Sequence, residues 1–259
     1  MLYLRFTFLF LSLSICAQET IETSVINQKK VDMETLVSIN NFETLFYLKN
    51  NVLHEKNNLK TNNYSNLQLG KIHSANTFNP LKINLFYKDF NTVIILDNRL
   101  AEIYKIDFNN LPSYKNVSKI TTGSDNTIWV FNQDLQLLEL YDYKANIIRA
   151  KTLTVKSTVL DLKSNYNYCF LLTTNFLYIY NYFGSLISKH KNDGFTVIEE
   201  TNENLILKKE NKLFYLKKDT GNIVPILTQN FLINQFFVTN ETLYIYDNVT
   251  LQELQLKIK

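Results

Sequence analysis

The stretch TIWVFNQDLQLLELYD, residues 127–142, determines the fold expected for this chain. It consists of two apolar runs, rich in β-branched and aromatic residues, separated by the polar segment Asn132-Gln133-Asp134. Runs of this kind on either side of turn-forming residues predict two antiparallel strands joined by a short connection. The same arrangement recurs at intervals of 30 to 43 residues, with further polar turns near Asn50, Asp89, Thr174, Glu210 and Asn240.

A further strand-like run precedes each pair and another follows it. Around residues 127–142 these runs are VSKITTG, residues 117–123, and NIIRAKTLT, residues 146–154. The repeating unit is therefore four short antiparallel strands in about 30 to 45 residues, which is typical of a β-propeller blade. We predict an all-β chain folded as a β-propeller of six blades, with seven blades as the alternative count. The predicted blades span residues 31–69, 70–113, 114–155, 156–193, 194–229 and 230–259.

Packing explains why such units would form a ring. A four-stranded sheet alone leaves apolar faces and unpaired edges in water, so it is not stable by itself. The run TVIIL, residues 92–96, is apolar at consecutive positions, which predicts that both faces of its sheet are buried. The last predicted blade is short, and we expect a segment within residues 20–40 to complete its sheet and close the ring. A β-sandwich is the alternative all-β fold, but it does not require six similar units.

The composition excludes several classes of protein. Hydrophobic residues make up 46% and charged residues 20% of the chain, so it contains enough apolar surface for a core and is not disordered throughout. A net charge of +3 is too small to indicate binding to nucleic acid or to an anionic membrane surface. The chain has only 5 glycines and contains no P-loop and no G-x-G-x-x-G motif, which argues against a glycine-rich phosphate-binding loop.

The first residues have the pattern of a secretory signal peptide. Arg5 provides a positive charge, residues 6–15 are mostly apolar, and the small Ala17 precedes a polar stretch. The apolar run is too short for a stable transmembrane helix. We therefore predict a signal peptide at residues 1–18 and a single β-propeller domain at residues 19–259. The mature chain would have no transmembrane span and would reside in the periplasm or at the periplasmic face of the outer membrane.

Two cysteines bear on this prediction. The segment Leu13-Ser14-Ile15-Cys16 has the outline of a lipobox. The bulky Ile15 stands where a small residue is usual, so we favour a cleaved signal over lipidation at Cys16. Removal of the signal leaves Cys169 alone, and one cysteine cannot form an internal disulfide. Cys169 lies in an apolar run, so we expect a buried thiol rather than a nucleophile.

The sequence contains no pattern of catalytic or metal-binding residues. The histidines His54, His73 and His190 have none of the spacings of zinc sites. The adjacent acids Glu199 and Glu200 would point to opposite faces of a strand, so they would not act together as an acid–base pair. We therefore expect no catalytic residue, no metal site and no cofactor, and we expect that the protein is not an enzyme.

Aromatic residues are the remaining candidates for function. We expect Trp129, in the segment GSDNTIWV at residues 123–130, to pack between blades. This segment resembles the D-x-x-G-x-I-W-V segments of bacterial repeat propellers such as the NHL-like and quinoprotein-like families, with its Asp and Gly displaced. Tyrosines at alternate positions share one face of a strand, where they pack between sheets or form an interface. The candidate interaction residues are Tyr141, Tyr143, Tyr178, Tyr180, Tyr182, Tyr244 and Tyr246.

Two resemblances suggest a role. The ICAQ sequence at the end of the signal, residues 15–18, resembles export signals common in the Bacteroidota, and the chain resembles small exported propeller-like proteins of that phylum. It resembles outer-membrane assembly propeller lipoproteins more loosely. These resemblances imply a non-catalytic scaffold that binds a protein complex of the periplasm or outer membrane. One variant is a subunit that caps or gates an outer-membrane export channel, such as the plug of the type IX translocon. The alternatives are a small-ligand or glycan-binding propeller, a propeller lyase or hydrolase, and a secreted adhesin.

Overall fold

The computed structural model describes residues 19–258, and this part of the chain is all-β. It contains 24 strands and two short 3₁₀ helices, η1 (Leu67–Leu69) and η2 (Lys88–Phe90). Neither of the helices within this range has the length and apolar character that a bilayer span requires. The predicted signal peptide at residues 1–18 and the lipidation candidate Cys16 lie outside the described residues.

Sixteen of the strands form four separate antiparallel sheets of four strands each. The first sheet contains β2 (Thr35–Ile39), β3 (Leu45–Lys49), β4 (Val52–Lys56) and β5 (Thr61–Tyr64). The second contains β6 (Ser74–Asn76), β7 (Ile83–Tyr87), β8 (Thr92–Leu96) and β9 (Glu102–Asp107). The third contains β10 (Val117–Thr122), β11 (Thr127–Asn132), β12 (Leu137–Asp142) and β13 (Ile147–Lys151). The fourth contains β14 (Val159–Ser164), β15 (Tyr168–Thr173), β16 (Phe176–Asn181) and β17 (Leu186–Lys191).

The remaining eight strands form one larger sheet. One half consists, in order, of β18 (Val197–Thr201), β19 (Asn204–Lys209), β20 (Lys212–Leu216) and β21 (Ile223–Leu227). The other half continues from β21 with β1 (Ile21–Lys30), β24 (Thr250–Lys257), β23 (Thr242–Tyr246) and β22 (Gln235–Thr239).

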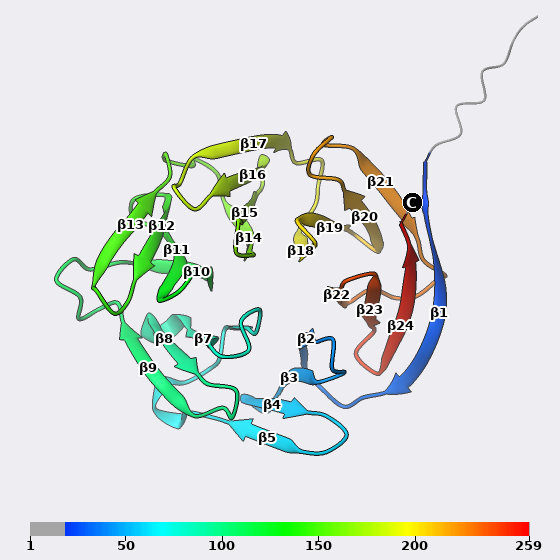
Figure 1. The fold of residues 1–259 in the computed structure, drawn as a ribbon, viewed down its shortest axis with the longest axis horizontal. Coiled ribbons are helices and arrows are strands. Elements are labelled where there is room, and N and C mark those ends of the chain that lie inside the picture. Colours follow the sequence, from blue (N-terminus) through cyan, green and yellow to red (C-terminus); the bar gives the residue numbers. More distant parts are fainter. Residues whose placement is uncertain (1–18, 259) are drawn as a thin grey trace, which may run out of the picture.

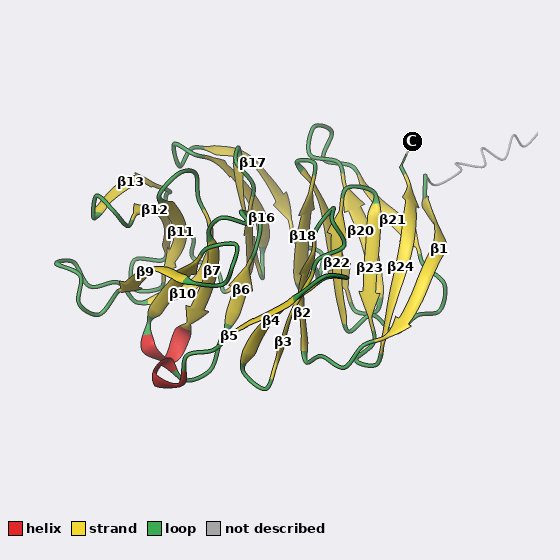
Figure 2. Ribbon diagram, turned by 60° about the horizontal axis from the view of Figure 1, so that its bottom comes forward, coloured by secondary structure: helices red, strands yellow, loops and turns green. Residues whose placement is uncertain are grey.

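The sheets are arranged around a central axis, as in a propeller (Figure 1). The strands nearest the axis are β2, β10, β14, β18 and β22, and β6, which contacts β2, has the same place in the second sheet. Contacts join β22 to β2, β2 to β6, β10 to β14, β14 to β18 and β18 to β22. In an oblique view the strands run across the thickness of a disc, and the two 3₁₀ helices lie together at one edge of it (Figure 2).

The number of separate sheets differs from the prediction. We expected six sheets of four strands, whereas the structure has four such sheets and one sheet of eight. The reason is the position of β1, which pairs antiparallel with β24 and also meets β21 in a short parallel pairing at Ile21–Ile226 and Glu22–Leu227. The expectation that a segment within residues 20–40 completes the last sheet is confirmed, because β1 adds the strand beside β24.

Asparagine-rich turns connect many of the strands. Asn50-Asn51 joins β3 to β4 with φ values of 51° and 60°, and Asn202-Glu203 joins β18 to β19 with 48° and 67°. Two successive residues with positive φ form the type of hairpin turn whose twist matches the flanking strands, and Asn tolerates this conformation better than most residues. Positive φ values at Glu210 and Asn240 place turns at two further predicted positions.

Apolar side chains fill the spaces between neighbouring sheets. Strand β8, the TVIIL run, is buried at every position. Its Ile94 packs with the first sheet and its Ile95 with the third, which confirms that both faces are covered. Trp129 is fully buried between the third and fourth sheets, as expected, and Cys169 lies in the same cluster. Burial raises the pKa of the Cys169 thiol well above its ordinary value, so the thiol is not poised as a nucleophile.

Candidate functional site

The predicted interaction tyrosines lie mostly in the core. Tyr178 and Tyr182 are half-buried, and Tyr182 donates a hydrogen bond of 2.6 Å to the carbonyl of Asn165. The other five are buried and pack between neighbouring sheets: Tyr141, Tyr143, Tyr180, Tyr244 and Tyr246. That these seven tyrosines contact a partner protein stays a prediction. The more accessible aromatic side chains lie elsewhere on the molecule.

The three histidines do not converge on one site. His54 lies on β4 of the first sheet and stacks on Tyr47, with ring centroids 4.7 Å apart. His73 immediately precedes β6 of the second sheet, and His190 lies on β17 of the fourth. Among residues 19–258, no group of three or more His, Cys, Asp or Glu side chains is placed to hold a metal ion.

A belt of side-chain hydrogen bonds links the ends of the innermost strands. Ser38 of β2 bonds to Thr77, which follows β6. Asn76 of β6 donates to Thr121 Oγ1 of β10 at 3.1 Å. The Thr121 and Ser164 hydroxyls, 2.9 Å apart, join β10 to β14. These short polar side chains therefore hold four neighbouring innermost strands together without any charge.

The belt continues around the other half of the axis. The Thr201 hydroxyl of β18 donates to the carbonyl of Asn240, which follows β22, at 2.8 Å. The Thr239 hydroxyl of β22 donates to the carbonyl of Ile39 on β2. An ion pair between β14 and β18 completes the belt, so each neighbouring pair of innermost strands has a polar link. A closed network of this kind makes the end of the channel rigid.

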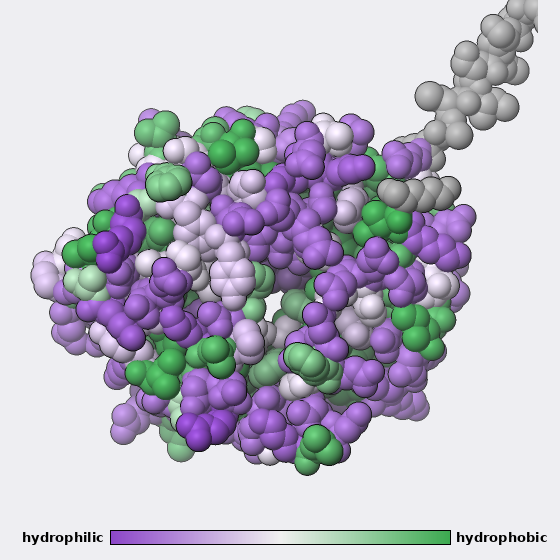
Figure 3. All heavy atoms as spheres, viewed as in Figure 1, coloured by the Kyte–Doolittle hydropathy of each residue, from purple (hydrophilic) through white to green (hydrophobic). Residues whose placement is uncertain are grey.

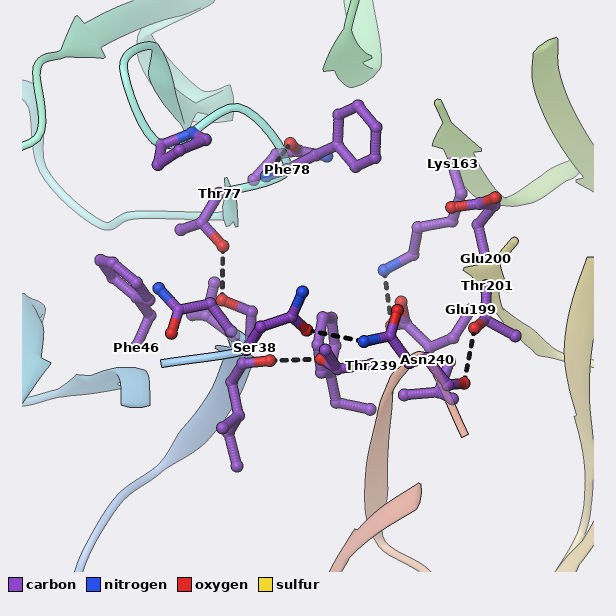
Figure 4. A pocket seen from close by; sticks show the side chains of 18 of the residues that line it. Ser38, Phe46, Thr77, Phe78, Lys163, Glu199, Glu200, Thr201, Thr239 and Asn240 are labelled. Carbon is purple, nitrogen blue, oxygen red and sulfur yellow. Dashed lines mark hydrogen bonds and ion pairs between the residues drawn. The ribbon is translucent and has the colours of Figure 1, made fainter. Parts of the chain in front are cut away.

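The belt surrounds a cavity of about 400 Å³ at the end of the axis where the innermost strands finish. We call it the channel-mouth cavity; its wall is formed by residues 37–42, 46, 75–78, 80, 163–164, 199–202 and 237–240. Figure 3 shows that the molecule is hollowed at its centre along this axis. Figure 4 shows the side chains of the wall, which come from the first, second, fourth and eight-stranded sheets. The cavity is therefore shared by four of the five sheets rather than belonging to one.

An ion pair lies in the wall of this cavity (Figure 4). Lys163 Nζ is 2.6 Å from Glu199 Oε1, and both side chains are largely shielded from solvent. Burial raises the pKa of Glu199 to about 7, although the Lys163 ammonium acts in the opposite direction. Glu199 therefore titrates near neutral pH, unlike an ordinary surface glutamate.

The neighbouring Glu200 has different partners. Its carboxylate accepts hydrogen bonds from Asn165 Nδ2 at 2.8 Å and from the backbone N–H of Glu203 at 2.7 Å. Burial raises the pKa of Glu200, and these hydrogen bonds lower it. Both acids contribute to the cavity wall without sharing a hydrogen-bond partner, and the Glu200 charge adds to the raised pKa of Glu199.

Three accessible aromatic side chains lie beside the polar wall. Phe42, between β2 and β3, is 87% exposed, and Phe78, after β6, is 37% exposed. Both contribute to the cavity wall. Tyr166, between β14 and β15, is 56% exposed and packs against Phe78, with ring centroids 4.8 Å apart. The channel mouth thus combines hydrogen-bonding groups with apolar surface, which is the usual composition of a binding site.

Sequence reasoning missed this site, although a signal for it was present. A hydroxyl residue followed by asparagine ends the first strand of several units, as in Ser164-Asn165, Thr201-Asn202 and Thr239-Asn240. The hydroxyl forms the belt and the asparagine starts the turn. Because this pair recurs at the end of the first strand, it predicts a ring of hydroxyl and amide groups. That prediction requires knowing that the first strand of each unit lies nearest the axis.

The sequence matches no family model and no curated protein. The fold is similar to virginiamycin B lyase from Staphylococcus aureus, solved with quinupristin, with a TM-score of 0.60 and 12% identity over 88% of this chain and 99% of the lyase chain. It is also similar to a streptogramin B lyase, with a TM-score of 0.59 and 11% identity over 89% of this chain and 98% of the other. A chain of the mitotic checkpoint complex matches with a TM-score of 0.59 and 8% identity, covering 89% of this chain and 93% of the other. At these identities the similarity shows the propeller-like fold alone.

One expectation from the sequence is corrected by these comparisons. We expected that the protein is not an enzyme, because no catalytic motif is apparent. The similar structures include virginiamycin B lyase, which is an enzyme with this fold. The absence of a familiar motif therefore does not exclude catalysis, and the channel-mouth cavity must be considered for both binding and chemistry.

Proposed function

We propose that this protein is an interaction module that binds a segment of a partner protein at its channel-mouth cavity. The observation that supports this proposal most directly is the cavity itself, which places hydroxyl, amide and charged groups beside the exposed Phe42 and Phe78. Turns and loops presented by a rigid scaffold are common binding surfaces, and exposed aromatic side chains supply much of the contact energy in interfaces.

The charges of the cavity favour one kind of partner segment. Two carboxylates, Glu199 and Glu200, contribute to the wall with one ammonium, that of Lys163. When Glu199 is ionised it neutralises this ammonium, and Glu200 then provides the unbalanced charge. We expect the partner segment to present a lysine or arginine side chain together with an apolar residue that packs on Phe42 or Phe78.

The proposal includes the architecture and the compartment. We take the eight-stranded sheet to act as two blades. Each half has four strands, with β18 or β22 innermost, and so repeats the arrangement of the other sheets. The leader-like residues 1–18 support export, with the partner a complex in the periplasm or at the outer membrane. A rigid disc with a polar central opening is suited to capping or gating an export channel of that membrane.

Affinity purification from native membranes of the source organism tests this function. The wild-type protein should recover a partner at a near-stoichiometric level. The variant F42S/F78S should lose the partner, because it removes the apolar side chains of the channel mouth. The control L153S/F183S changes two apolar side chains, 86% and 85% exposed, that lie outside the cavity.

The comparison of the two variants decides the outcome. Loss of the partner from F42S/F78S, with retention by L153S/F183S, supports binding at the channel mouth. Equal recovery by both variants would place the interaction elsewhere, and recovery of the monomer alone would count against an interaction module. Circular dichroism of each variant checks that both retain the strand content of the wild type.

A second candidate function is a lyase, and one observation favours it. Glu199 lies in the cavity wall with its pKa raised to about 7 by burial, and a general base works best when its pKa is near the working pH. The test is incubation of the wild type and E199Q with quinupristin, followed by mass spectrometry of the product. Turnover by the wild type alone would favour this function over the interaction module.

A further inference from the structure

A second cavity lies at the opposite end of the innermost strands. It has a volume of about 500 Å³ and is formed at the beginnings of β10 and β14, with additional residues from η2 and from the turn between β11 and β12. The channel-mouth cavity is formed where the innermost strands end, so the two cavities lie on opposite faces of the disc. We call the second one the strand-start cavity.

The polar lining of the strand-start cavity carries positive charge without a compensating acid. Lys88 of η2 and Lys119 of β10 both line it, and no Asp or Glu does. Lys119 is half-buried and Lys88 is exposed, whereas the buried Lys115 has a carboxylate partner, Glu139, at 2.6 Å. Within residues 19–258, neither the Lys88 nor the Lys119 ammonium has an ion pair or a side-chain hydrogen bond.

The pKa of the neighbouring His73 responds to the same positive charge. Partial burial lowers its pKa most, and the charges of Lys119 and Lys88 lower it further. Asp89, next to Lys88 in the chain, acts in the opposite direction with a smaller effect. The net influence of these groups on His73 is therefore that of a positive field, which attracts anions.

Uncharged polar side chains and three apolar ones, Phe131, Val155 and Val159, form the rest of the lining. Ser118 and Thr158 contribute hydroxyls, and Gln133 and Gln136 contribute amides. None of these four side chains has a hydrogen-bond partner within the described part of the chain, so all of them are available to a ligand. Hydroxyls and amides can both donate and accept, which suits a ligand with several hydroxyl groups.

We propose that the strand-start cavity binds a sugar phosphate, with Lys88 and Lys119 holding the phosphate and the hydroxyl and amide side chains holding the sugar. Two lysine charges match the charge of a phosphate monoester, which is about −1.5 to −2 at neutral pH. Lysine is a regular phosphate-binding residue, which acts on the phosphate as a point charge. A cavity of about 500 Å³ has the size of a small-molecule site, so a bare phosphate ion would leave most of it empty.

Isothermal titration calorimetry at low ionic strength tests this assignment. The probes are glucose 6-phosphate, ribose 5-phosphate and glycerol 3-phosphate, compared with glucose and with inorganic phosphate. At least one of the three esters should bind saturably and more tightly than either glucose or inorganic phosphate. The variant K88Q/K119Q should weaken that binding by at least tenfold.

The control is K105Q/K144Q, which removes the same charge from two exposed lysines outside the cavity. It should bind the ester as the wild type does. The assignment fails if none of the three esters binds, if inorganic phosphate binds as tightly as the best ester, or if both double variants are weakened equally. Cosedimentation with phosphatidylglycerol vesicles tests a lipid headgroup as the source of the phosphate. Binding to vesicles that K88Q/K119Q abolishes, without binding of the soluble esters, would overturn the assignment to a sugar phosphate.

Discussion

Lys115 and Glu139 are a charged pair inside the core. Lys115 Nζ lies 2.6 Å from Glu139 Oε2, and both side chains are less than 5% exposed. Lys151, which is half exposed, lies 3.2 Å from the other carboxylate oxygen. Removal of charges from water costs several kcal/mol per ion, so such a pair is tolerated only while both partners are present.

We therefore expect K115M to lower the free energy of unfolding by about 3 kcal/mol, measured by urea denaturation. The loss comes from the Glu139 carboxylate, which stays buried with only Lys151 nearby. The double variant K115M/E139L should recover most of the loss, because it removes both charges and keeps the volume. If K115M were as stable as the wild type, the Glu139 carboxylate would have to be hydrated or paired with another cation.

Glu199 makes stability depend on pH. Its pKa rises from an ordinary 4.5 to about 7 in the folded protein, because burial disfavours the charged form. Between these values the folded state holds a proton that the unfolded state has lost, so the contribution of Glu199 to stability falls as pH rises. We expect the unfolding free energy of the wild type, relative to E199Q, to decrease from pH 5 to pH 7.

Urea denaturation of both proteins at four pH values between 5 and 8 measures this difference. Glu203 lies outside the channel-mouth cavity, and its hydrogen bonds from Lys218 and Asn167 lower its pKa, so E203Q provides the control. A lowered pKa contributes stability at higher pH, so the wild type compared with E203Q should not show the decrease. A constant difference between the wild type and E199Q across the range would contradict the raised pKa.

At the scale of the elements, the hairpin between β10 and β11 depends on one glycine. Gly123 donates its N–H to the Thr127 carbonyl at 3.0 Å, and the Thr127 hydroxyl donates to the Ser124 carbonyl at 2.6 Å. A Cβ on residue 123 would lie 2.6 Å from the Thr127 carbonyl oxygen, which is closer than real Cβ contacts. The hairpin must open to accept any side chain there.

We expect G123A to lower the free energy of unfolding by roughly 1 to 3 kcal/mol, as overpacking of a tight site usually does. The neighbouring S124A variant is the control, because the Ser124 side chain has no hydrogen bond in the described structure while its carbonyl does. Thermal unfolding followed by circular dichroism compares the two. Equal melting temperatures of G123A and the wild type would show that the turn relaxes without cost.

The whole molecule is closed by its first strand. Eight residue pairs join β1 to β24, and two more join it to β21. Only Ile21 of this strand is buried. Most of the contribution of β1 to the stability of the fold therefore comes from its backbone hydrogen bonds and from covering the sheet edges. The strand converts the last three strands of the chain into a complete four-stranded set.

A chain that begins at residue 31 should therefore be less stable than one that begins at residue 19. We expect a fall in melting temperature of at least about 5 °C, which corresponds to roughly 2 kcal/mol for a protein of this size. Differential scanning calorimetry measures the fall and shows whether unfolding remains one transition. Identical melting temperatures of the two chains would show that the ring is stable without β1.

Local patterns account for what the sequence predicted well. The apolar runs around polar turns predicted the strands, and the continuous run of β8 predicted burial of both faces, because these properties depend on neighbours along the chain. The same reasoning failed for function. The tyrosine sets share strand faces as expected, but five of the seven face the core, and alternation along a strand does not distinguish an inner face from an outer one.

The sequence by itself determined that the chain is all-β, that it repeats four-stranded units, and that its N-terminal strand returns to the end of the chain. Tertiary structure alone decided that β1 would fuse two sets of strands into one sheet, and that Ser38, Lys163 and Glu199 would meet at the axis. The physical reason is distance along the chain. Strand and turn propensities act over a few residues, whereas the belt, the channel-mouth cavity and the strand-start cavity exist only after units far apart in sequence have packed into a ring.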